Sequence, residues 1–193
     1  MFQCSARPVA TFLTFLLAAA PLQAREDPLA AELAAIRAHL DAGEGAEAIA
    51  AARRLHAAVA KDAGFGLTNA GLTVEPAEGY GVYTPRDGNI YAEGEPVHAY
   101  VEPFGQTLVD LPDGQRAMRY DIRFAVLDAD GKPLSDLIAL DTVDLPSWHE
   151  PIDAYLRLTF RVSAPPGDYI IHAEITDTPT GRAAPVQWAV RFR

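Results

Sequence analysis

The sequence has almost no cysteine: Cys4 carries the only thiol among 193 residues. Cys4 precedes the apolar run Val9–Ala20 instead of following it directly, so it does not occupy the position of a lipidated lipoprotein cysteine. Removal of the segment that contains Cys4 leaves a chain without any thiol. Such a chain is held by packing alone, which excludes the small disulfide-rich scaffolds of extracellular space.

Positive charge is also scarce, since 16 Lys and Arg residues face 26 Asp and Glu residues. This balance argues against nucleic acid and anionic lipid surfaces as partners. The five histidines lie on different predicted elements, and no Cys or Met cluster joins them into a metal site. The run from Asp128 to Gly131 departs from a calcium-binding loop, which has glycine at its sixth position, and predicts a hairpin turn. We therefore expect neither a metal nor a cofactor.

Long hydrophobic runs are absent outside the first two dozen residues. There, Arg7 precedes the apolar run, and Ala24 offers a small residue for cleavage. The run is well short of the ~20 residues that a membrane-spanning helix needs. The pattern predicts a signal peptide at residues 1–24, a mature chain without a transmembrane segment, and a periplasmic or secreted location in a bacterium.

Residues 25–66 have the pattern of a helical hairpin. Asp27 and Pro28 form a helix start, with an N-cap acid followed by proline. Apolar residues recur at helical spacing on both sides of a glycine-rich break: Leu29, Leu33, Ile36, Leu40, Ile49, Ala52, Leu55 and Val59. The pair resembles a single tetratricopeptide-type unit, and such a unit needs a neighbour to bury its faces. We therefore expect the two helices to pack on the rest of the chain or on a partner, through Leu33, Ile36, Leu55 and Val59.

From residue 67 onward the apolar spacing changes to the alternation of half-buried strands. The strongest alternation covers four segments: Arg119–Leu127, Tyr155–Val162, Tyr169–Asp177 and Ala184–Phe192. Shorter strands are expected at five segments: Thr68–Val74, Gly81–Tyr83, Val97–Glu102, Gln106–Asp110 and Leu137–Val143. The chain is therefore predicted to be mainly β, an antiparallel immunoglobulin-like β-sandwich at residues 67–193 preceded by the helical hairpin. Four large residues are expected in its core: Phe124, Phe160, Ile171 and Trp188.

Two resemblances to known families support this architecture. The C-terminal part resembles the closing hairpin of immunoglobulin-like and fibronectin type III-like bacterial domains in Pro165–Tyr169, Asp177, Gly181 and Val186–Phe192. The middle of the chain is similar to a pattern in uncharacterised secreted bacterial proteins in Gly79–Arg86, Gly94–Val97 and Tyr100–Pro103. Both resemblances imply an architecture, and neither implies an activity.

The stretch from Tyr80 to Glu102 is the best candidate for binding, because tyrosines alternate there with charged residues. Aromatic faces beside polar groups suit the recognition of proteins, peptides or sugars. The candidate ligand- or partner-binding residues are Tyr83, Arg86, Tyr91, Tyr100 and Glu102. Such a surface requires Tyr83, Arg86 and Tyr100 to be exposed. The competing interpretation is that these tyrosines fill the edge of the sandwich.

One compact group has a catalytic appearance, the run from Ser147 to Glu150 with Trp148 and His149 between them. A hydrolase needs a nucleophile, a base and an orienting acid, but the Gly-x-Ser-x-Gly turn that presents such a serine is missing. The competing interpretation is a loop in which Trp148 closes one end of the core. We assign no catalytic residue on this basis.

The sequence predicts an exported, non-catalytic binding or interaction protein of the bacterial periplasm. Its expected partner is another periplasmic or envelope protein. Two alternatives remain open at this point: a carbohydrate- or peptide-binding module that uses the Tyr80–Tyr100 aromatics, and a hydrolase built around Ser147 and His149.

Overall fold

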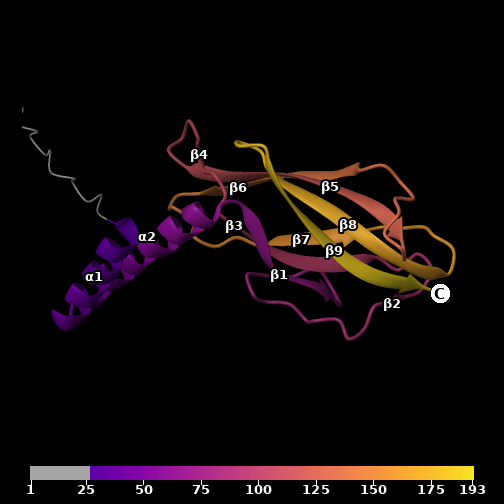
Figure 1. Cartoon of the computed structure of the whole chain (residues 1–193), viewed down its shortest axis with the longest axis horizontal. Helices are drawn as coiled ribbons and strands as arrows, with labels where there is room; N and C mark the ends of the chain where they lie inside the picture. Colours follow the sequence, from indigo (N-terminus) through magenta and orange to yellow (C-terminus); the bar gives the residue numbers. More distant parts are fainter. Residues whose placement is uncertain (1–26) are drawn as a thin grey trace, which may run out of the picture.

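The computed structural model describes residues 27–193, so the predicted signal peptide at residues 1–24 lies outside the described residues. This part of the chain is mainly β, and its two helices precede the sheets (Figure 1). None of its helices is long and apolar enough to cross a membrane. The elements are α1 (Pro28–Asp41), α2 (Gly45–Ala63), β1 (Gly66–Thr73), β2 (Ile90–Tyr91), β3 (Val97–Phe104), β4 (Val109–Asp110), β5 (Arg116–Asp128), β6 (Ile138–Ser147), β7 (Leu156–Phe160), β8 (Gly167–Asp177) and β9 (Arg182–Phe192).

The strands form two sheets that enclose one hydrophobic core (Figure 1). The smaller sheet is antiparallel and has the order β1-β3-β7. The larger sheet has the order β2-β9-β8-β5-β4, with β6 on the other edge of β5. Among the described strands only β2 runs parallel to its neighbour. The four strongly alternating segments are confirmed as the strands β5, β7, β8 and β9.

Two of the weaker strand predictions are wrong in whole or in part. Residues 81–83 form no strand, because Gly81 has a φ of 66° and the Val82 N–H donates to the Gly79 carbonyl at 3.0 Å, which closes a turn. Residues 106–110 contribute only their last two residues, as β4. The short strand β2 carries no alternation that would predict it.

The core confirms the inward faces expected for the strong strands. Phe160 and Ile171 are fully buried, Trp188 is buried, and Phe124 packs against the cluster from its margin. The Phe160 ring contacts both other aromatics, with centroids 5.3 Å from Phe124 and 5.7 Å from Trp188. Burial of such rings supplies much of the free energy that holds a domain without disulfides.

Two smaller expectations about the strands are also confirmed. Outward-facing residues pair across strands, as Arg123 of β5 does with Glu174 of β8. The Asp128 carboxylate accepts hydrogen bonds from the backbone N–H groups of Asp130 and Lys132 at 3.1 and 2.8 Å. This segment is therefore the predicted hairpin turn.

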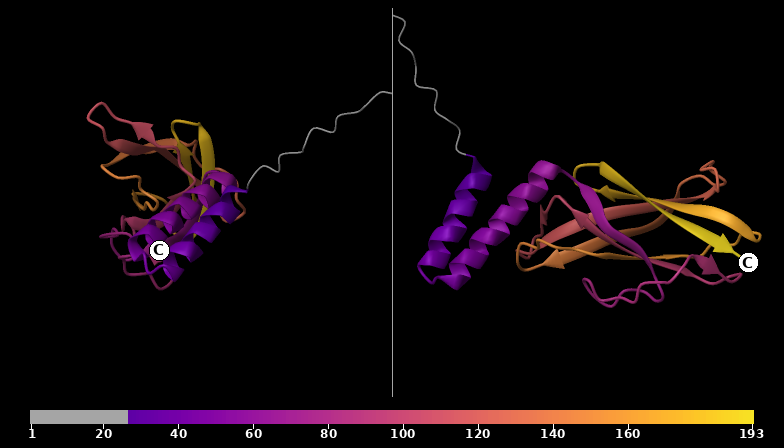
Figure 2. Two further views of the ribbon diagram at one scale, coloured as in Figure 1. Left: turned by 90° about the vertical axis from the view of Figure 1, so that its left-hand side faces the viewer. Right: turned by 60° about the horizontal axis from the view of Figure 1, so that its bottom comes forward.

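The helical hairpin begins as predicted, with the Asp27 carboxylate accepting a hydrogen bond from the Leu29 N–H at 3.0 Å. The helices do not pack on the sheets, which are one of the two docking sites that the sequence predicts for them. The hairpin projects from one end of the sheet domain as an arm (Figures 1 and 2). Ala48 and Ala51 are the buried residues of the pair, and Ile36 and Leu55 are half-buried. Other large aliphatic side chains stay exposed, and Leu33 is 57% exposed.

The arm is attached to the sheet domain at its base. Gly105 approaches the end of α2 so closely that a Cβ at this position would lie 2.1 Å from the Gly64 carbonyl oxygen. Phe65, which follows the helix, stacks on Tyr120 with ring centroids 6.2 Å apart. Glycine is required at position 105 because of this approach and because its φ is 68°. The rest of the arm extends away from the sheets (Figure 2).

Candidate functional site

The predicted tyrosine-rich surface is an internal hydrogen-bond cluster around the buried carboxylate of Glu102. The Tyr100 hydroxyl donates to Glu102 Oε1 at 2.6 Å. Glu102 Oε2 accepts from Asn69 Nδ2 at 2.6 Å and from the Tyr80 hydroxyl at 3.1 Å. Three donors therefore compensate for the removal of this charge from water, as a buried charge requires.

Tyr100 is 0% exposed, so the expectation that it stands on an accessible face is wrong. The loop that follows β1 covers it: the Gly81 N–H donates to the Tyr100 hydroxyl at 2.9 Å, and the Tyr83 ring stacks on the Tyr100 ring at 4.3 Å. The ring of Tyr155 lies 5.8 Å away. Burial, and then the hydrogen bond to Glu102, raise the pKa of Tyr100 from 10.0 to about 12. The hydroxyl is thus a structural donor.

Arg86 and Tyr91 form a second internal cluster. The Arg86 guanidinium lies 4.0 Å from the centre of the Tyr91 ring, forms an ion pair with Glu95 at 2.8 Å, and donates to the Ile90 carbonyl at 2.8 Å. Tyr91 is fully buried, and burial raises the pKa of its hydroxyl. The five residues that the sequence singles out therefore hold the 75–95 loops in place, in two clusters, and do not form one open surface.

The run around Ser147 does not form a catalytic group in the described structure. Ser147 Oγ accepts a hydrogen bond from the backbone N–H of His149 at 3.2 Å, and no serine hydroxyl in residues 27–193 bonds to a histidine ring. Trp148 is 68% exposed, so the expectation that it closes one end of the core is also wrong. The segment follows the end of β6, and Trp148, His149 and Glu150 are all exposed.

The histidines are also separated in space. His98 lies on β3 and contacts the Thr159 hydroxyl at 2.9 Å, whereas His172 lies on β8 in the other sheet and contacts Gln187. No group of three or more His, Cys, Asp or Glu side chains in the described range is placed to hold a metal ion.

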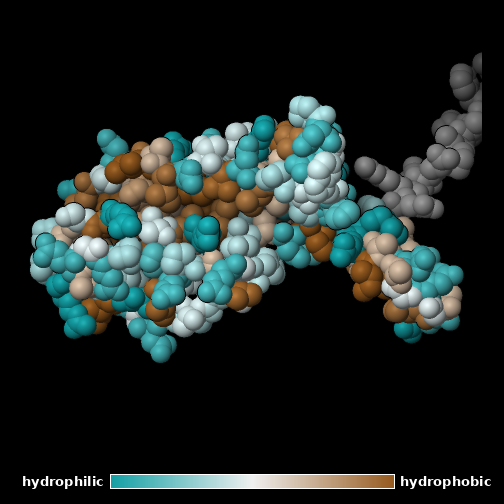
Figure 3. Space-filling view, turned by 180° about the vertical axis from the view of Figure 1, so that it is seen from behind, coloured by the Kyte–Doolittle hydropathy of each residue, from teal (hydrophilic) through white to brown (hydrophobic). Residues whose placement is uncertain are grey.

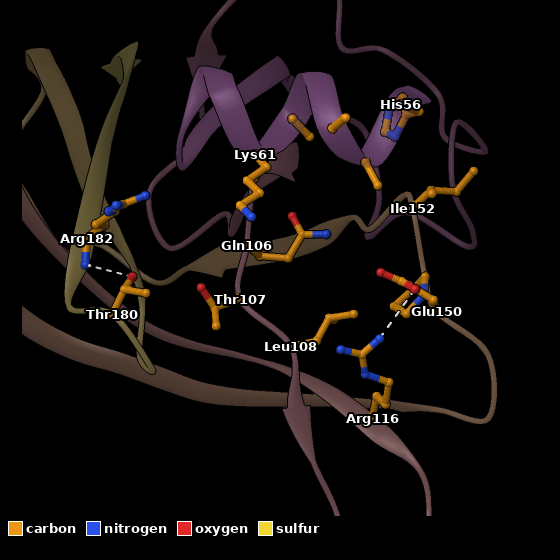
Figure 4. A pocket seen from close by; sticks show the side chains of 15 residues that line it. His56, Lys61, Gln106, Thr107, Leu108, Arg116, Glu150, Ile152, Thr180 and Arg182 are labelled. Carbon is orange, nitrogen blue, oxygen red and sulfur yellow. Dashed lines mark hydrogen bonds and ion pairs between the residues drawn. The ribbon is translucent and has the colours of Figure 1, made fainter. Parts of the chain in front are cut away.

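A pocket of about 680 Å³ lies at the base of the arm, between the end of α2 and the edges of the sheets (Figure 4). Three cations line it. Arg116 pairs with Asp110 at 3.3 Å and with Glu150 at 3.4 Å. Lys61 and Arg182 form no ion pair within the described residues, although both line the same pocket.

The polar wall of this pocket is held by a buried carboxylate. Asp177 is fully buried and accepts hydrogen bonds from the Thr107 N–H at 3.1 Å and from the Thr180 hydroxyl at 2.5 Å. Both threonines line the pocket. In the described structure, no serine or threonine hydroxyl of the lining is hydrogen-bonded to a histidine or lysine side chain. The lining residues come from separate segments of the chain, and no sequence pattern brings them together.

The arm carries a set of large aliphatic side chains that are between 49% and 60% exposed in the described structure (Figure 3). We call them the exposed arm residues: Leu33, Leu40, Ile49 and Val59. Leu33 and Leu40 are seven positions apart and therefore share one face of α1. Ile49, on α2, is 60% exposed. The helical periodicity marked all four residues, but it predicted their burial.

Comparisons with known proteins do not identify a family. No protein-family model matches the chain, and no curated protein matches it. Solved structures align with it at low identity. Alkylpurine DNA glycosylase AlkC of Pseudomonas fluorescens is 11% identical with a TM-score of 0.38, over 78% of this chain and 39% of that chain. A Niemann-Pick type C2 protein from the Japanese carpenter ant is 9% identical with a TM-score of 0.41, over 67% of this chain and 92% of that chain.

Proposed function

We propose that the protein is an exported, non-catalytic interaction protein of the bacterial periplasm, which binds another envelope protein through its helical arm. The observation that carries this proposal is the exposure of the arm residues on a hairpin that projects away from the sheets. Export is supported by the signal-peptide pattern at residues 1–24.

The exposed arm residues favour a helical partner. Burying a fully exposed Leu or Ile side chain contributes roughly 1.5–3 kcal/mol. A partner that covers the exposed arm residues would therefore gain part of this free energy on binding. Two antiparallel helices with apolar residues outside their mutual contact correspond to half of a helical bundle, which further helices complete.

The sheet domain is proposed to be an immunoglobulin-like β-sandwich that serves as the scaffold of the arm. Two sheets around one core, together with the closing hairpin of β8 and β9, support this proposal. A sugar- or peptide-binding role for the tyrosines has less support, because Tyr91 and Tyr100 are fully buried. The hydrolase alternative lacks a contact between Ser147 and the His149 ring in the described structure.

A crosslinking experiment in the periplasm tests the arm as the binding element. A photoreactive amino acid at Leu33 or Ile49 should give an adduct with a helical envelope protein. The same probe at Arg37 or Arg53, exposed polar positions of the same helices, should give far less. Leu33→Gln with Ile49→Gln should abolish capture at unchanged melting temperature, whereas Arg53→Gln should leave capture intact. Equal adducts at all positions, or an adduct of the chain with itself alone, would contradict the proposal.

A further inference from the structure

A cleft of about 930 Å³ opens between the two sheets, along the side where β6 and β7 are the outermost strands. Its apolar lining comes from three strands: Ile122, Leu140, Val143, Leu145, Leu156 and Leu158. The space-filling view from behind shows a band of hydrophobic residues running along the sheet domain (Figure 3). The cleft is separate from the arm and from the pocket at its base, since none of its lining residues belongs to either.

The apolar wall of the cleft is the inner face of β6, which no strand of the smaller sheet covers. Val143 lies opposite Tyr120, and Leu145 lies opposite Met118, so both face the core side of the larger sheet. Leu140 has no partner on β5, because the register shifts by one residue there. All three β6 residues are only half-buried, although they point the same way as fully buried neighbours.

The opposite wall is the free edge of β7. This strand pairs with β3 on one side only. Residues 153–159 line the cleft without interruption, although neighbouring residues of a strand point to opposite faces. The cleft therefore runs along the edge of β7, where alternate backbone N–H and C=O groups lack a strand partner in the described structure.

The apolar inner face of β6 and the free edge of β7 together favour one kind of ligand. We propose that the cleft binds an extended peptide segment of a partner protein, which adds to the free edge of β7 as a fourth strand of the smaller sheet. A strand in this position places every second side chain against Leu140, Val143 and Leu145. An acyl chain would cover the same leucines but leave the backbone groups of β7 without hydrogen-bond partners. A peptide can make both the apolar contacts with β6 and the backbone hydrogen bonds with β7.

The acidic residues around the cleft favour a peptide with basic residues at its ends. Asp141 and Asp153 line its rim, and Arg157 is the one cation among its lining residues. Arg157 lies opposite Tyr100 and so belongs to the outer face of the smaller sheet. Asp153 also lies 3.9 Å from His56 at the base of the arm. A segment with alternating apolar residues and a Lys or Arg at its ends fits this arrangement.

A random nonapeptide library, displayed on phage and selected on the full mature chain, tests the proposal directly. The expected sequences have apolar residues at every second position and a basic residue near one end. Enrichment of apolar residues at a spacing of three and four instead would assign binding to the arm and overturn the cleft. A failure to enrich any sequence would also overturn it. The inference is independent of the function proposed for the arm, because the two outcomes differ in periodicity.

Backbone methylation of a selected peptide then separates strand addition from simple apolar contact. Alternate amides of an added strand face β7, so N-methyl groups on one alternate set should weaken binding by at least ~10-fold, through loss of two or more hydrogen bonds. Methylation of the other set should leave binding nearly unchanged. Equal affinities for both methylated peptides, or full displacement of the peptide by palmitate, would contradict strand addition.

A matched pair of variants places the binding in the cleft. Val143→Glu puts a charge on the inner face of β6 and should abolish peptide binding, whereas Thr142→Glu, on the exposed outer face of the same strand, should leave it intact. Equal binding by the two variants would contradict the assignment. If Val143→Glu does not fold, the methylated peptides decide the question on the unaltered chain.

Discussion

The sheet domain has a core of large buried apolar side chains, whereas the arm buries no large apolar side chain. In the sheets, Tyr91, Tyr120 and Phe160 are fully buried in a core built from strands that are far apart in the sequence. In the arm, the buried residues are two alanines, and Leu33, Leu40 and Ile49 are more than half exposed. The difference shows that an apolar stripe identifies a helix but does not identify what the helix packs against.

The largest expected effect comes from removing an aromatic side chain from the sheet core. Phe160→Ala should lower the free energy of unfolding by roughly 3–5 kcal/mol, because the change leaves a cavity between Phe124 and Trp188. Leu33→Ala in the arm, the matched deletion of an apolar side chain, should change it by less than about 0.5 kcal/mol. Urea denaturation of both variants measures the contrast. Similar losses would show that the arm is packed on the sheets after all.

A smaller effect is expected on the outer face of the smaller sheet. Tyr100→Phe removes one of three donors to the buried Glu102 carboxylate and leaves the Gly81 N–H without its acceptor. The expected loss is about 1–3 kcal/mol, the cost of leaving buried polar groups unpaired. Tyr83→Phe keeps the stacking and serves as the control. If both variants are as stable as the parent chain, the tyrosine cluster contributes no structural hydrogen bond.

Alkaline pH should act on the sheets through their buried tyrosines, because the arm residues 27–64 contain no tyrosine. Folding raises the pKa of Tyr100 from 10.0 to about 12, so the folded state retains this proton where the unfolded chain loses it. Burial raises the pKa values of Tyr91 and Tyr120 in the same direction. The stabilisation is complete below pH 10 and is lost as the pH rises toward 12. A melting temperature that stays constant from pH 9 to about 12 would contradict the burial of these hydroxyls.

The smallest effect on stability is expected at the junction of the two regions. Lys61 and Arg182 form no ion pair in the described structure, so Lys61→Gln and Arg182→Gln should each shift the free energy of unfolding by less than about 0.5 kcal/mol. Thermal melts of both variants check this. Arg116→Gln is the informative comparison, because Arg116 has two acidic partners. An equal loss in all three variants would mean that the unpaired cations are structural.

Local patterns could predict most of the fold. Alternation marks β5, β7, β8 and β9, and the Asp27–Pro28 pair marks the start of α1, because both signals depend on neighbouring residues. The two-residue strand β2 exists through pairing with the distant strand β9, and such pairing leaves no local signal.

The candidate sites were much less predictable. Tyr100 alternates with apolar residues as an exposed side chain would, yet the loop that carries Tyr83 folds over it. A residue on the outer face of a sheet is buried when a loop from elsewhere in the chain covers it. The alternation within one strand contains no information on the path of that loop. The cleft along β6 and β7 and the pocket beside Lys61 are each lined by residues from separate segments of the chain. Their positions depend on how the strands and helices are arranged in space, which local sequence patterns do not show.

The central claim, that the arm serves a partner and not the fold, is tested most directly by deleting Asp27–Gly64 and measuring both thermal unfolding and partner capture. The account predicts a melting temperature within about 4 °C of the full mature chain, a shift that corresponds to roughly 1 kcal/mol in a domain of this size, together with complete loss of the arm-dependent partner. A fall in melting temperature of more than about 10 °C, or undiminished capture, would contradict it.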